Sequence, residues 1–262
     1  MKKVNINNRR LRSIVQFLSF VIHNLGFNMA LKTGIITPAL YCYGCPLAFF
    51  ACPFGTLQHF ISLSRFSPYL AGSIGAYSMF AGRFYCGWIC PFGAFQDLVR
   101  GVGKRIGIKG FKVRYLMLPP LIVLALALLL AYIYEDTVFC RACPSGTLFA
   151  TIPYHLLNPG ENPSVYFYLH VLSLATVVIL TLSIDRFWCR YLCPIGIIYG
   201  LFNKLSLIKV KVDENLCSRC GICLKSCPMG ISSIKDIGSS PGCILCLECM
   251  RKCPTKAIKL KL

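Results

Sequence analysis

Two short runs of the sequence each carry a pair of cysteines with the spacing of metal ligands. Residues 84–91 and 187–194 both read aromatic, aromatic, Cys, three residues, Cys, Pro. A C-x3-C spacing places two thiols about one helical turn apart, and a helix that starts at the following Pro favours a nearby thiolate. Two thiolates cannot complete a four-iron cluster, but two equivalent pairs can. We therefore expect one [4Fe-4S] cluster, with free thiols as the alternative, at Cys86, Cys90, Cys189 and Cys193.

Eight further cysteines, near the end of the chain, have the spacing of a bacterial two-cluster ferredoxin. They form two C-x2-C-x2-C-x3-C-Pro runs, at residues 217–228 and 243–254. In such proteins the fourth cysteine of each run binds the other cluster. Zinc sites use separated C-x2-C pairs, so this spacing disfavours zinc. One [4Fe-4S] cluster is expected on Cys217, Cys220, Cys223 and Cys253, and a second on Cys243, Cys246, Cys249 and Cys227.

The composition of the chain is typical of a membrane protein. Of its 262 residues, 56% are hydrophobic and only 14% are charged, and the mean hydropathy is +0.63. The 17 cysteines suit metal thiolates better than a disulfide scaffold, because such scaffolds are small and secreted. The net charge of +19 lies in blocks between apolar stretches, which indicates membrane topology rather than nucleic-acid binding. No dinucleotide fingerprint or P-loop is present, so NAD and ATP chemistry are not expected.

Four apolar stretches predict transmembrane helices, at residues 13–31, 68–84, 115–134 and 165–184. Ser67 and Pro68 have the residue types of a helix N-cap and first helical position. Shorter apolar pieces at residues 57–63 and 147–157 predict half-helices. The fold class expected is an all-α membrane domain, residues 1–209, followed by a small α+β ferredoxin domain with two [4Fe-4S] clusters, residues 210–262.

The distribution of Lys and Arg predicts how the chain is oriented. These residues are frequent before the first span, between the second and third spans, and after the fourth, and they are rare in the two opposite loops. By the positive-inside rule, both termini, both C-x3-C-Pro pairs and the ferredoxin domain face the cytoplasm. The expected location is the prokaryotic cytoplasmic membrane, crossed several times. The remaining cysteines then lie near the outer face: Cys42, Cys45, Cys52, Cys140 and Cys143.

An internal repeat relates the inner and outer cysteines. Residues 51–57 match residues 142–148 at six of seven positions, which divides the chain into two halves, about residues 13–104 and 115–204. Because two predicted spans separate equivalent points, the halves are expected to have the same orientation. Such halves are expected to be related by a pseudo-two-fold axis along the membrane normal. The repeat predicts an outer cluster on Cys45, Cys52, Cys140 and Cys143, with Cys42 as the alternative to Cys45. A disulfide or a redox-active dithiol stays open, because the outer side is oxidising.

The histidines are candidates for contacts with a cofactor. His59 and His155 lie near the outer cysteines and could hydrogen-bond a quinone. His23 and His170 fall in predicted spans, where an ionisable residue is a candidate site. Packing between helices is the alternative for all of these, and a haem between His23 and His170 is not expected.

These motifs resemble the NapH-type membrane ferredoxins of periplasmic nitrate reductase systems and the C-terminal half of NosR-type proteins of nitrous oxide respiration. A more distant resemblance is to the membrane ferredoxin used in assembly of haem-copper oxidases. The resemblance implies electron transfer between the quinone pool, or a cytoplasmic donor, and extracytoplasmic partners. The outer cysteines depart from the NapH-type pattern, which favours a chain of centres that reaches the outer face. The residues that carry the resemblance are the eight ferredoxin cysteines with Cys86, Cys90, Pro91, Cys189, Cys193 and Pro194.

The expected function is that of an iron–sulfur electron-transfer subunit in a larger oxidoreductase complex. It would relay electrons between the cytoplasmic ferredoxin domain and a quinone or an extracytoplasmic redox partner, and its own catalysis would be at most quinone oxidoreduction. Two alternatives stay open. One is a transmembrane thiol or metal reductant relay that ends in a Cys42-x2-Cys45 dithiol, and the other is a redox-sensing assembly factor. A trapped mixed disulfide would favour the thiol relay, and a reduced protein that passes no electrons to any acceptor would favour the assembly factor.

Overall fold

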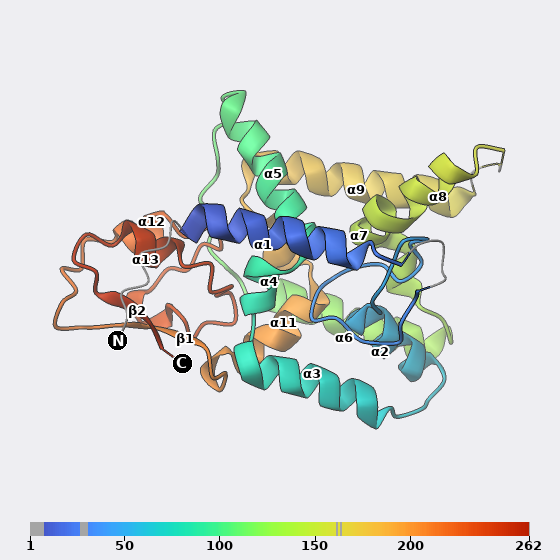
Figure 1. The fold of residues 1–262 in the computed structure, drawn as a ribbon, viewed down its shortest axis with the longest axis horizontal. Helices are drawn as coiled ribbons and strands as arrows, with labels where there is room; N and C mark the ends of the chain where they lie inside the picture. The colour runs from blue at the N-terminus through green and yellow to red at the C-terminus, as the bar shows by residue number, and fades with distance from the viewer. Residues whose placement is uncertain (1–7, 27–30, 161, 163, 262) are drawn as a thin grey trace.

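The computed structural model describes residues 8–26, 31–160, 162 and 164–261, which form a helical body with a ferredoxin-like region at one end (Figure 1). Four long helices run lengthwise through the body and surround shorter ones. They correspond to the four predicted spans, and their bounds are α1 Asn8–His23, α3 Pro68–Ala81, α6 Leu118–Ile133 and α9 Val165–Ser183.

The remaining helices follow the cysteine motifs, and all but the 15-residue α5 are shorter than those of the predicted spans. In the first half they are α2 Pro53–Ser62, α4 Phe84–Trp88 and α5 Pro91–Arg105. In the second half they are η1 Val138–Ala142, α7 Pro144–Gly146, η2 Thr147–Thr151, α8 Ile152–Leu157, α10 Phe187–Tyr191, α11 Pro194–Leu201 and η3 Phe202–Lys204. Helix α5 packs on α1 and α9, whereas α11 packs on α6 and α3. If α1, α3 and α5 of the first half correspond to α6, α9 and α11 of the second, each set of contacts is converted into the other. A pseudo-two-fold axis between the halves produces this pattern.

Helix α3 shows how local sequence sets these boundaries. Ser67 Oγ accepts a hydrogen bond from the Leu70 N–H at 3.4 Å, and Pro68 is the first helical residue, as predicted. Gly82 caps the end of the helix with a φ of 51°, a conformation that residues with a side chain rarely adopt. At 14 residues α3 is about 21 Å long, which is shorter than a bilayer core of about 30 Å.

The prediction of four membrane spans is supported in part. Within the described ranges, α9 alone is both long and apolar enough to cross a membrane, and α6 is apolar but shorter. Part of the first predicted span, residues 27–30, lies outside the described residues. All four crossings therefore stay predictions, and α9 is the one that its length and composition favour.

Helices α1 and α9 each bury polar side chains and expose large apolar ones. Helix α1 buries Gln16, Ser19 and His23, while Phe17 and Leu18 are exposed by 66% and 52%. Helix α9 likewise buries Thr181 and exposes Leu172 and Ile179. This distribution is the reverse of that on a surface helix of a water-soluble protein.

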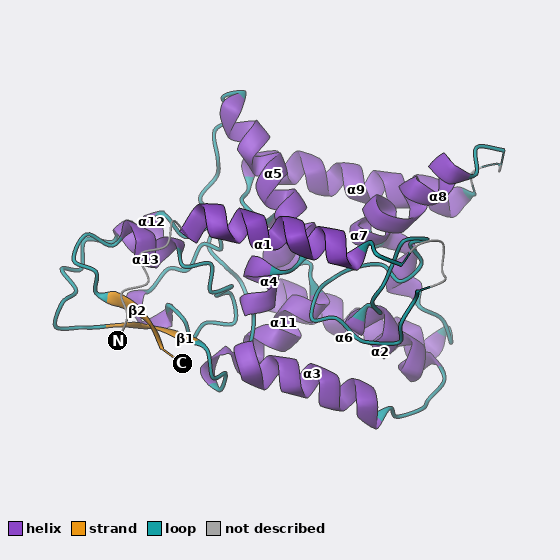
Figure 2. Ribbon diagram, viewed as in Figure 1, coloured by secondary structure: helices purple, strands orange, loops and turns teal. Residues whose placement is uncertain are grey.

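The ferredoxin-like region combines one small sheet with short helices (Figure 2). Strands β1 Lys209–Val212 and β2 Ile258–Lys261 are antiparallel, with Val210 opposite Leu260. The helices between them are α12 Ile222–Lys225, η4 Ile234–Asp236 and α13 Glu248–Lys252. Trp88 of α4 packs in the core of this region, and its Nε1 donates to the Leu245 carbonyl at 3.0 Å. The two predicted domains therefore share an apolar core.

Candidate metal centres

Two hollows in the ferredoxin-like region gather its eight cysteines. One hollow is lined by Cys217, Cys220, Cys223 and Cys253. The other is lined by Cys227, Cys243, Cys246 and Cys249, together with Cys223. These groups correspond to the two predicted ligand sets, including the exchanged fourth cysteines. The assignment of each ligand stays a prediction, and the lining of the hollows is in its favour.

Tight turns direct backbone donors at these thiols. Leu245 and Leu247, on either side of Cys246, have φ values of 49° and 61°, a conformation that non-glycine residues adopt at a cost. A hydrogen bond from the backbone of Ile222 lowers the pKa of the Cys220 thiol. Such donors suit thiolate ligands. Since Cys220 is exposed, its set lies at the surface of the molecule.

The two C-x3-C-Pro pairs come together inside the helical body. Cys86 lies in α4 and Cys189 in α10, while Cys90 and Cys193 are the N-caps of α5 and α11. All of them are 4–7% exposed. Cys193 lies within electrostatic range of the other three thiols. We call these four cysteines the inner set. Their proximity fits one shared four-iron cluster, which remains a prediction.

Two buried arginines cross-link the pairs reciprocally. Arg83, three residues before Cys86, donates to the Cys189 carbonyl. Arg186, three residues before Cys189, donates to the Cys86 carbonyl at 2.6 Å. Both arginines are at most 1% exposed. The reciprocity supports the predicted two-fold relation, and the two positive charges would offset the negative charge of a thiolate-bound cluster.

Asp97 of α5 connects Arg186 to the first long helix. Arg186 Nε and Nη2 donate to its carboxylate at 2.8 and 2.6 Å, and Arg12 of α1 forms a second ion pair with it. Burial alone would raise the pKa of Asp97, but the charge and hydrogen bonds of Arg186 hold that pKa below its usual value. Arg12 also donates to the Gly87 carbonyl at 2.9 Å. The network therefore fixes α1, α4 and α5 around the inner set.

Four cysteines also meet at the other end of the helical body. Cys52 and Cys143 are the N-caps of α2 and α7, each directly before a proline. Cys140 lies within electrostatic range of Cys52 and Cys42, and Cys143 lies within range of all three. We call Cys42, Cys52, Cys140 and Cys143 the outer set.

Equivalent glycines show that Cys42 and Cys140 have matching places. A Cβ atom on Gly55, three residues after Cys52, would lie 3.7 Å from Cys140 Sγ. A Cβ atom on Gly146, three residues after Cys143, would lie 3.7 Å from Cys42 Sγ. Each glycine thus leaves room for one sulfur from the other half of the outer set.

Cys45 is placed differently from Cys42. Its Sγ lies 3.6 Å from the Tyr41 hydroxyl, which donates to Asn24 Oδ1 at 2.6 Å. The predicted use of Cys45 as the fourth outer ligand is untested, and the position of Cys42 within electrostatic range of Cys140 and Cys143 favours the alternative, Cys42. Burial raises the pKa of Cys42 to about 11 and that of Cys140 to about 12, so both thiols must lose a proton when they bind iron.

Two buried glutamines beside the sets were not predicted. Gln58 Nε2 lies 3.5 Å from Cys140 Sγ, and Gln96 Nε2 lies 3.2 Å from Cys189 Sγ. A sequence signal exists, because Cys-Pro-Phe-Gly-x-x-Gln occurs at residues 52–58 and again at 90–96. The signal becomes meaningful once the fold shows that each glutamine reaches a cysteine of the second half.

The histidines have protein partners. His23 Nδ1 donates to the Ser19 carbonyl at 2.7 Å, and its Nε2 lies 2.9 Å from Thr37 Oγ1. His170 Nε2 donates to the Cys140 carbonyl at 3.0 Å, and its Nδ1 lies 2.8 Å from Thr151 Oγ1. These bonds leave neither ring nitrogen free as a haem ligand and make His170 a support of the outer set.

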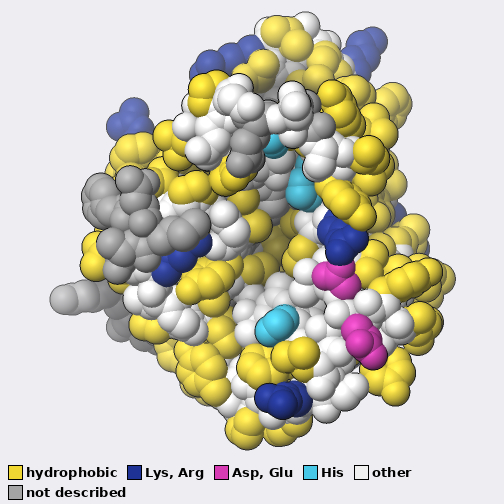
Figure 3. All heavy atoms as spheres, turned by 90° about the vertical axis from the view of Figure 1, so that its right-hand side faces the viewer, with side chains coloured by type: hydrophobic (Ala, Val, Ile, Leu, Met, Phe, Trp, Pro, Cys, Tyr) yellow, Lys and Arg dark blue, Asp and Glu magenta, His cyan; other side chains and the backbone are white. Residues whose placement is uncertain are grey.

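The other two histidines lie closer to the surface. His59 is exposed, and His155 is half-buried with its ring against Phe167 at 4.6 Å between centroids. Figure 3 shows the end of the molecule opposite the ferredoxin-like region. That face is hollowed at its middle, with histidine side chains in and beside the hollow. The quinone contacts predicted for His59 and His155 stay predictions.

The four cysteine sets are linked in succession through the molecule. The two ferredoxin-like hollows share Cys223. Arg186, which binds the Cys86 carbonyl, lies within electrostatic range of Cys246. Trp188 and Phe139, which precede Cys189 and Cys140, have ring centroids 5.9 Å apart and so join the inner and outer sets.

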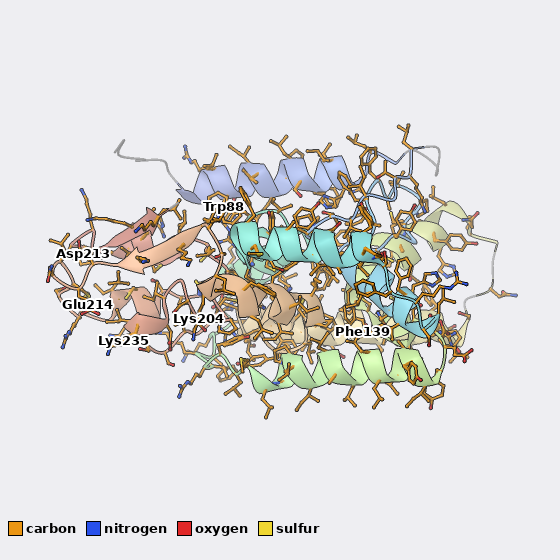
Figure 4. The ribbon with its side chains drawn as sticks, turned by 90° about the horizontal axis from the view of Figure 1, so that it is seen from below. Trp88, Phe139, Lys204, Asp213, Glu214 and Lys235 are labelled. Carbon is orange, nitrogen blue, oxygen red and sulfur yellow. The ribbon has the colours of Figure 1, made fainter. Side chains whose placement is uncertain are left out.

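Figure 4 places this succession along the molecule. Asp213, Glu214 and Lys235 mark the far end of the ferredoxin-like region, Trp88 marks its junction with the helical body, and Phe139 lies within that body. No three His, Cys, Asp or Glu side chains in the described ranges are grouped to hold a single metal ion. The ligands of a four-iron cluster bind separate corners of a cube, so they lie farther apart than the ligands of a single metal ion.

More than half of the chain matches a family model described as a 4Fe-4S binding domain, over residues 49–68, 70–109, 117–156 and 166–213. The chain belongs to this 4Fe-4S binding family. The matched segments contain both C-x3-C-Pro pairs. A second model of the same description matches residues 210–231. The family assignment confirms the predicted resemblance and the prediction of [4Fe-4S] clusters.

Relatives of this 4Fe-4S binding protein include ferredoxin-type proteins. An uncharacterized protein of Methanocaldococcus jannaschii is 32% identical over 178 residues, 68% of this chain and 64% of that protein. The methylamine utilization ferredoxin-type protein MauN of Methylobacillus flagellatus is 28% identical over 190 residues, 67% and 60% of the two chains. The regulatory protein NosR of Pseudomonas aeruginosa is 26% identical over 189 residues, 68% and 25%. The chain spans less than two thirds of each, and no solved structure matches it.

Proposed function

We propose that this chain is a membrane electron-transfer protein that carries electrons lengthwise through four [4Fe-4S] sites. The observation that carries the proposal is the succession of four cysteine sets, each linked to the next by shared or contacting residues. Bound clusters supply one-electron transfer. The protein holds the thiols, offsets their charge with Arg83 and Arg186, and excludes water from the inner set.

The apolar exterior supports a membrane location. Large apolar side chains of the long helices are exposed, as Phe17, Leu126 and Leu172 are, while polar side chains such as Gln16 and Thr181 are buried. Such a surface is unstable in water and suits lipid. The ferredoxin-like region then lies on the cytoplasmic side, and the outer set lies near the opposite face.

Each end of the succession has access to a redox partner. At the ferredoxin-like end, Cys220 is exposed, so its cluster can exchange electrons with a cytoplasmic carrier. At the outer end, the hollow with its histidine side chains admits an acceptor (Figure 3). We infer that this acceptor is a quinone or an extracytoplasmic redox protein, with His59 and His155 as candidate quinone contacts.

Transfer across a vesicle membrane tests the proposal. The full chain is placed in sealed proteoliposomes with cytochrome c trapped inside, and a reduced soluble ferredoxin is added outside. We expect the trapped cytochrome to be reduced. The double variant Cys86→Ala/Cys90→Ala should abolish this transfer while its ferredoxin-like clusters are still reduced. Cys45→Ala, outside the four sets, is the control and should behave as the unmodified chain. Equal rates in the double variant and the unmodified chain would refute the proposal.

A further inference from the structure

Two fully buried glutamines occupy equivalent positions in helices that start at a Cys-Pro pair. Gln58 lies in α2, six residues after Cys52, and Gln96 lies in α5, six residues after Cys90. Each is 0% exposed. A buried amide is costly unless its donors and acceptor are paired, so the partners of these two side chains reveal what they do.

The two amides make the same pair of hydrogen bonds. Gln96 Nε2 donates to Cys189 Sγ at 3.2 Å, and its Oε1 accepts from the Trp188 N–H at 3.0 Å. Gln58 Nε2 donates to Cys140 Sγ at 3.5 Å, and its Oε1 accepts from the Phe139 N–H at 3.1 Å. In both cases a glutamine of the first half binds a cysteine of the second half and the residue before it.

The backbone bond fixes the orientation of each amide. Only the oxygen of a glutamine can accept from a backbone N–H, so the Nε2 end must face the sulfur. The contact with the sulfur is therefore an N–H···S hydrogen bond rather than a contact with the amide oxygen. Because the helix and the partner backbone are both buried, the donor is held in place whether or not the thiol is ionised.

The second half of the chain lacks this donor. The residues six positions after Cys143 and Cys193 are Phe149 and Tyr199. Phe149 carries no polar group and stacks on Tyr41 at 4.8 Å between ring centroids. The Tyr199 hydroxyl is buried without a hydrogen-bond partner among the described residues. Each cysteine set thus receives a glutamine donor on one side of the pseudo-two-fold axis only.

We propose that Gln96 and Gln58 are positioning residues that raise the reduction potentials of the inner and outer clusters, respectively. This inference rests on the proposed function. An electron added to a cluster increases the negative charge on the ligand sulfurs, and a fixed N–H donor stabilises that charge. Hydrogen bonds to sulfur are among the factors that set the potentials of iron–sulfur clusters.

Redox titration of the full chain, followed by electron paramagnetic resonance, tests this inference. Gln96→Met removes the donor at similar side-chain length. It should change the equilibrium constant for reduction of the inner cluster about tenfold, which lowers the reduction potential of that cluster by about 59 mV for one electron. The outer potential should stay unchanged. Gln58→Met should do the reverse, so each variant is the matched control for the other.

A second substitution separates tuning from folding. Gln96→Glu keeps the oxygen that accepts from Trp188 but loses the donor and adds a negative charge, so the inner potential should fall further than in Gln96→Met. Unchanged potentials in both variants, or loss of the inner cluster in both, would overturn the inference. If the unmodified chain shows ferredoxin-type signals alone, the proposed function fails as well, so the two failures are distinguishable.

Discussion

Each of the inner and outer sets contains two cysteines from one local unit, Cys-Pro-x-Gly, at residues 52–55, 90–93, 143–146 and 193–196. The cysteine of every unit is a helix N-cap in extended conformation, with φ between −62° and −78° and ψ between 108° and 123°. The proline starts the helix, whose N-terminus favours a thiolate. In the outer units, Gly55 and Gly146 leave room for a sulfur. The same four-residue sequence therefore supplies two of the four cysteines in each set.

The choice between Cys42 and Cys45 can be tested one residue at a time. Cys42→Ala should remove the outer cluster and lower the iron content by about four per chain, because a cubane needs its fourth thiolate. Cys45→Ala should leave the iron unchanged, since Cys42 already gives the outer set its fourth thiol. Iron and acid-labile sulfide assays on the purified chain measure both. Iron loss in Cys45→Ala with none in Cys42→Ala would restore the prediction made from the repeat.

Asp97 should contribute to stability through its two arginines. Asp97→Asn leaves the buried Arg186 without its counter-ion and should lower the unfolding free energy by about 2 kcal/mol. This is less than for a fully buried pair, because the carboxylate is 32% exposed. The low pKa of Asp97 means that its contribution is present at neutral pH and is lost as pH falls through that pKa.

The thermal midpoint in detergent, followed from pH 7 to acid, measures this effect. Asp236→Asn is the control, because no ion pair of Asp236 is present in the described part of the chain, and it should change the unfolding free energy by less than about 0.5 kcal/mol. A difference between Asp97→Asn and the unmodified chain that is the same at every pH would contradict the role of the ionised carboxylate.

At the scale of elements, α1 differs from a surface helix of a soluble protein in that its buried face is polar. Gln16 donates to the Gly87 carbonyl at 3.1 Å, and Ser19 donates to the Ile89 carbonyl at 2.7 Å. These bonds anchor α1 to the segment that carries Cys86 and Cys90. The apolar face that remains outside has no protein partner among the described residues, which is why lipid is the expected neighbour.

An arginine on the exposed apolar face of α9 tests whether that face contacts lipid. Leu172 is 64% exposed near the middle of α9, and Leu207 is equally exposed outside the predicted spans. An arginine at the centre of a membrane helix costs about 2.5–3.5 kcal/mol on insertion scales. Leu172→Arg should therefore lower the amount of chain in the membrane fraction, whereas Leu207→Arg should not. Equal membrane fractions would argue that α9 does not face lipid.

Local sequence predicted the parts of the fold that depend on neighbouring residues. The start of α3 follows from Ser67 and Pro68, and the grouping of thiols follows from ligand spacing. The roles of Cys42 and Cys45 could not be predicted, because the path of that loop depends on the Ile36–Ala51 bridge and on contacts of Tyr41. The hydrogen bonds of Gln58 and Gln96 depend on how the two halves cross, which spacing along the chain does not determine.

At the scale of the whole molecule, the ferredoxin-like region is fixed to the helical body. Asn203 Nδ2 donates to the carbonyls of Ser240 and Cys243 at 2.7 and 2.8 Å, while its Oδ1 accepts from the Arg83 N–H. Arg83 in turn donates to the Pro241 carbonyl at 2.7 Å. These bonds hold one ferredoxin-like cysteine set at a fixed distance from the inner set, as an electron path requires.

Four clusters are proposed to occupy this path, and the iron content of the intact chain tests their presence most directly. The chain is purified without oxygen, and iron and acid-labile sulfide are measured per folded molecule. Four [4Fe-4S] clusters predict about 16 iron atoms per chain. A value near 8 would show that iron is confined to the ferredoxin-like region and would contradict the relay through the inner and outer sets.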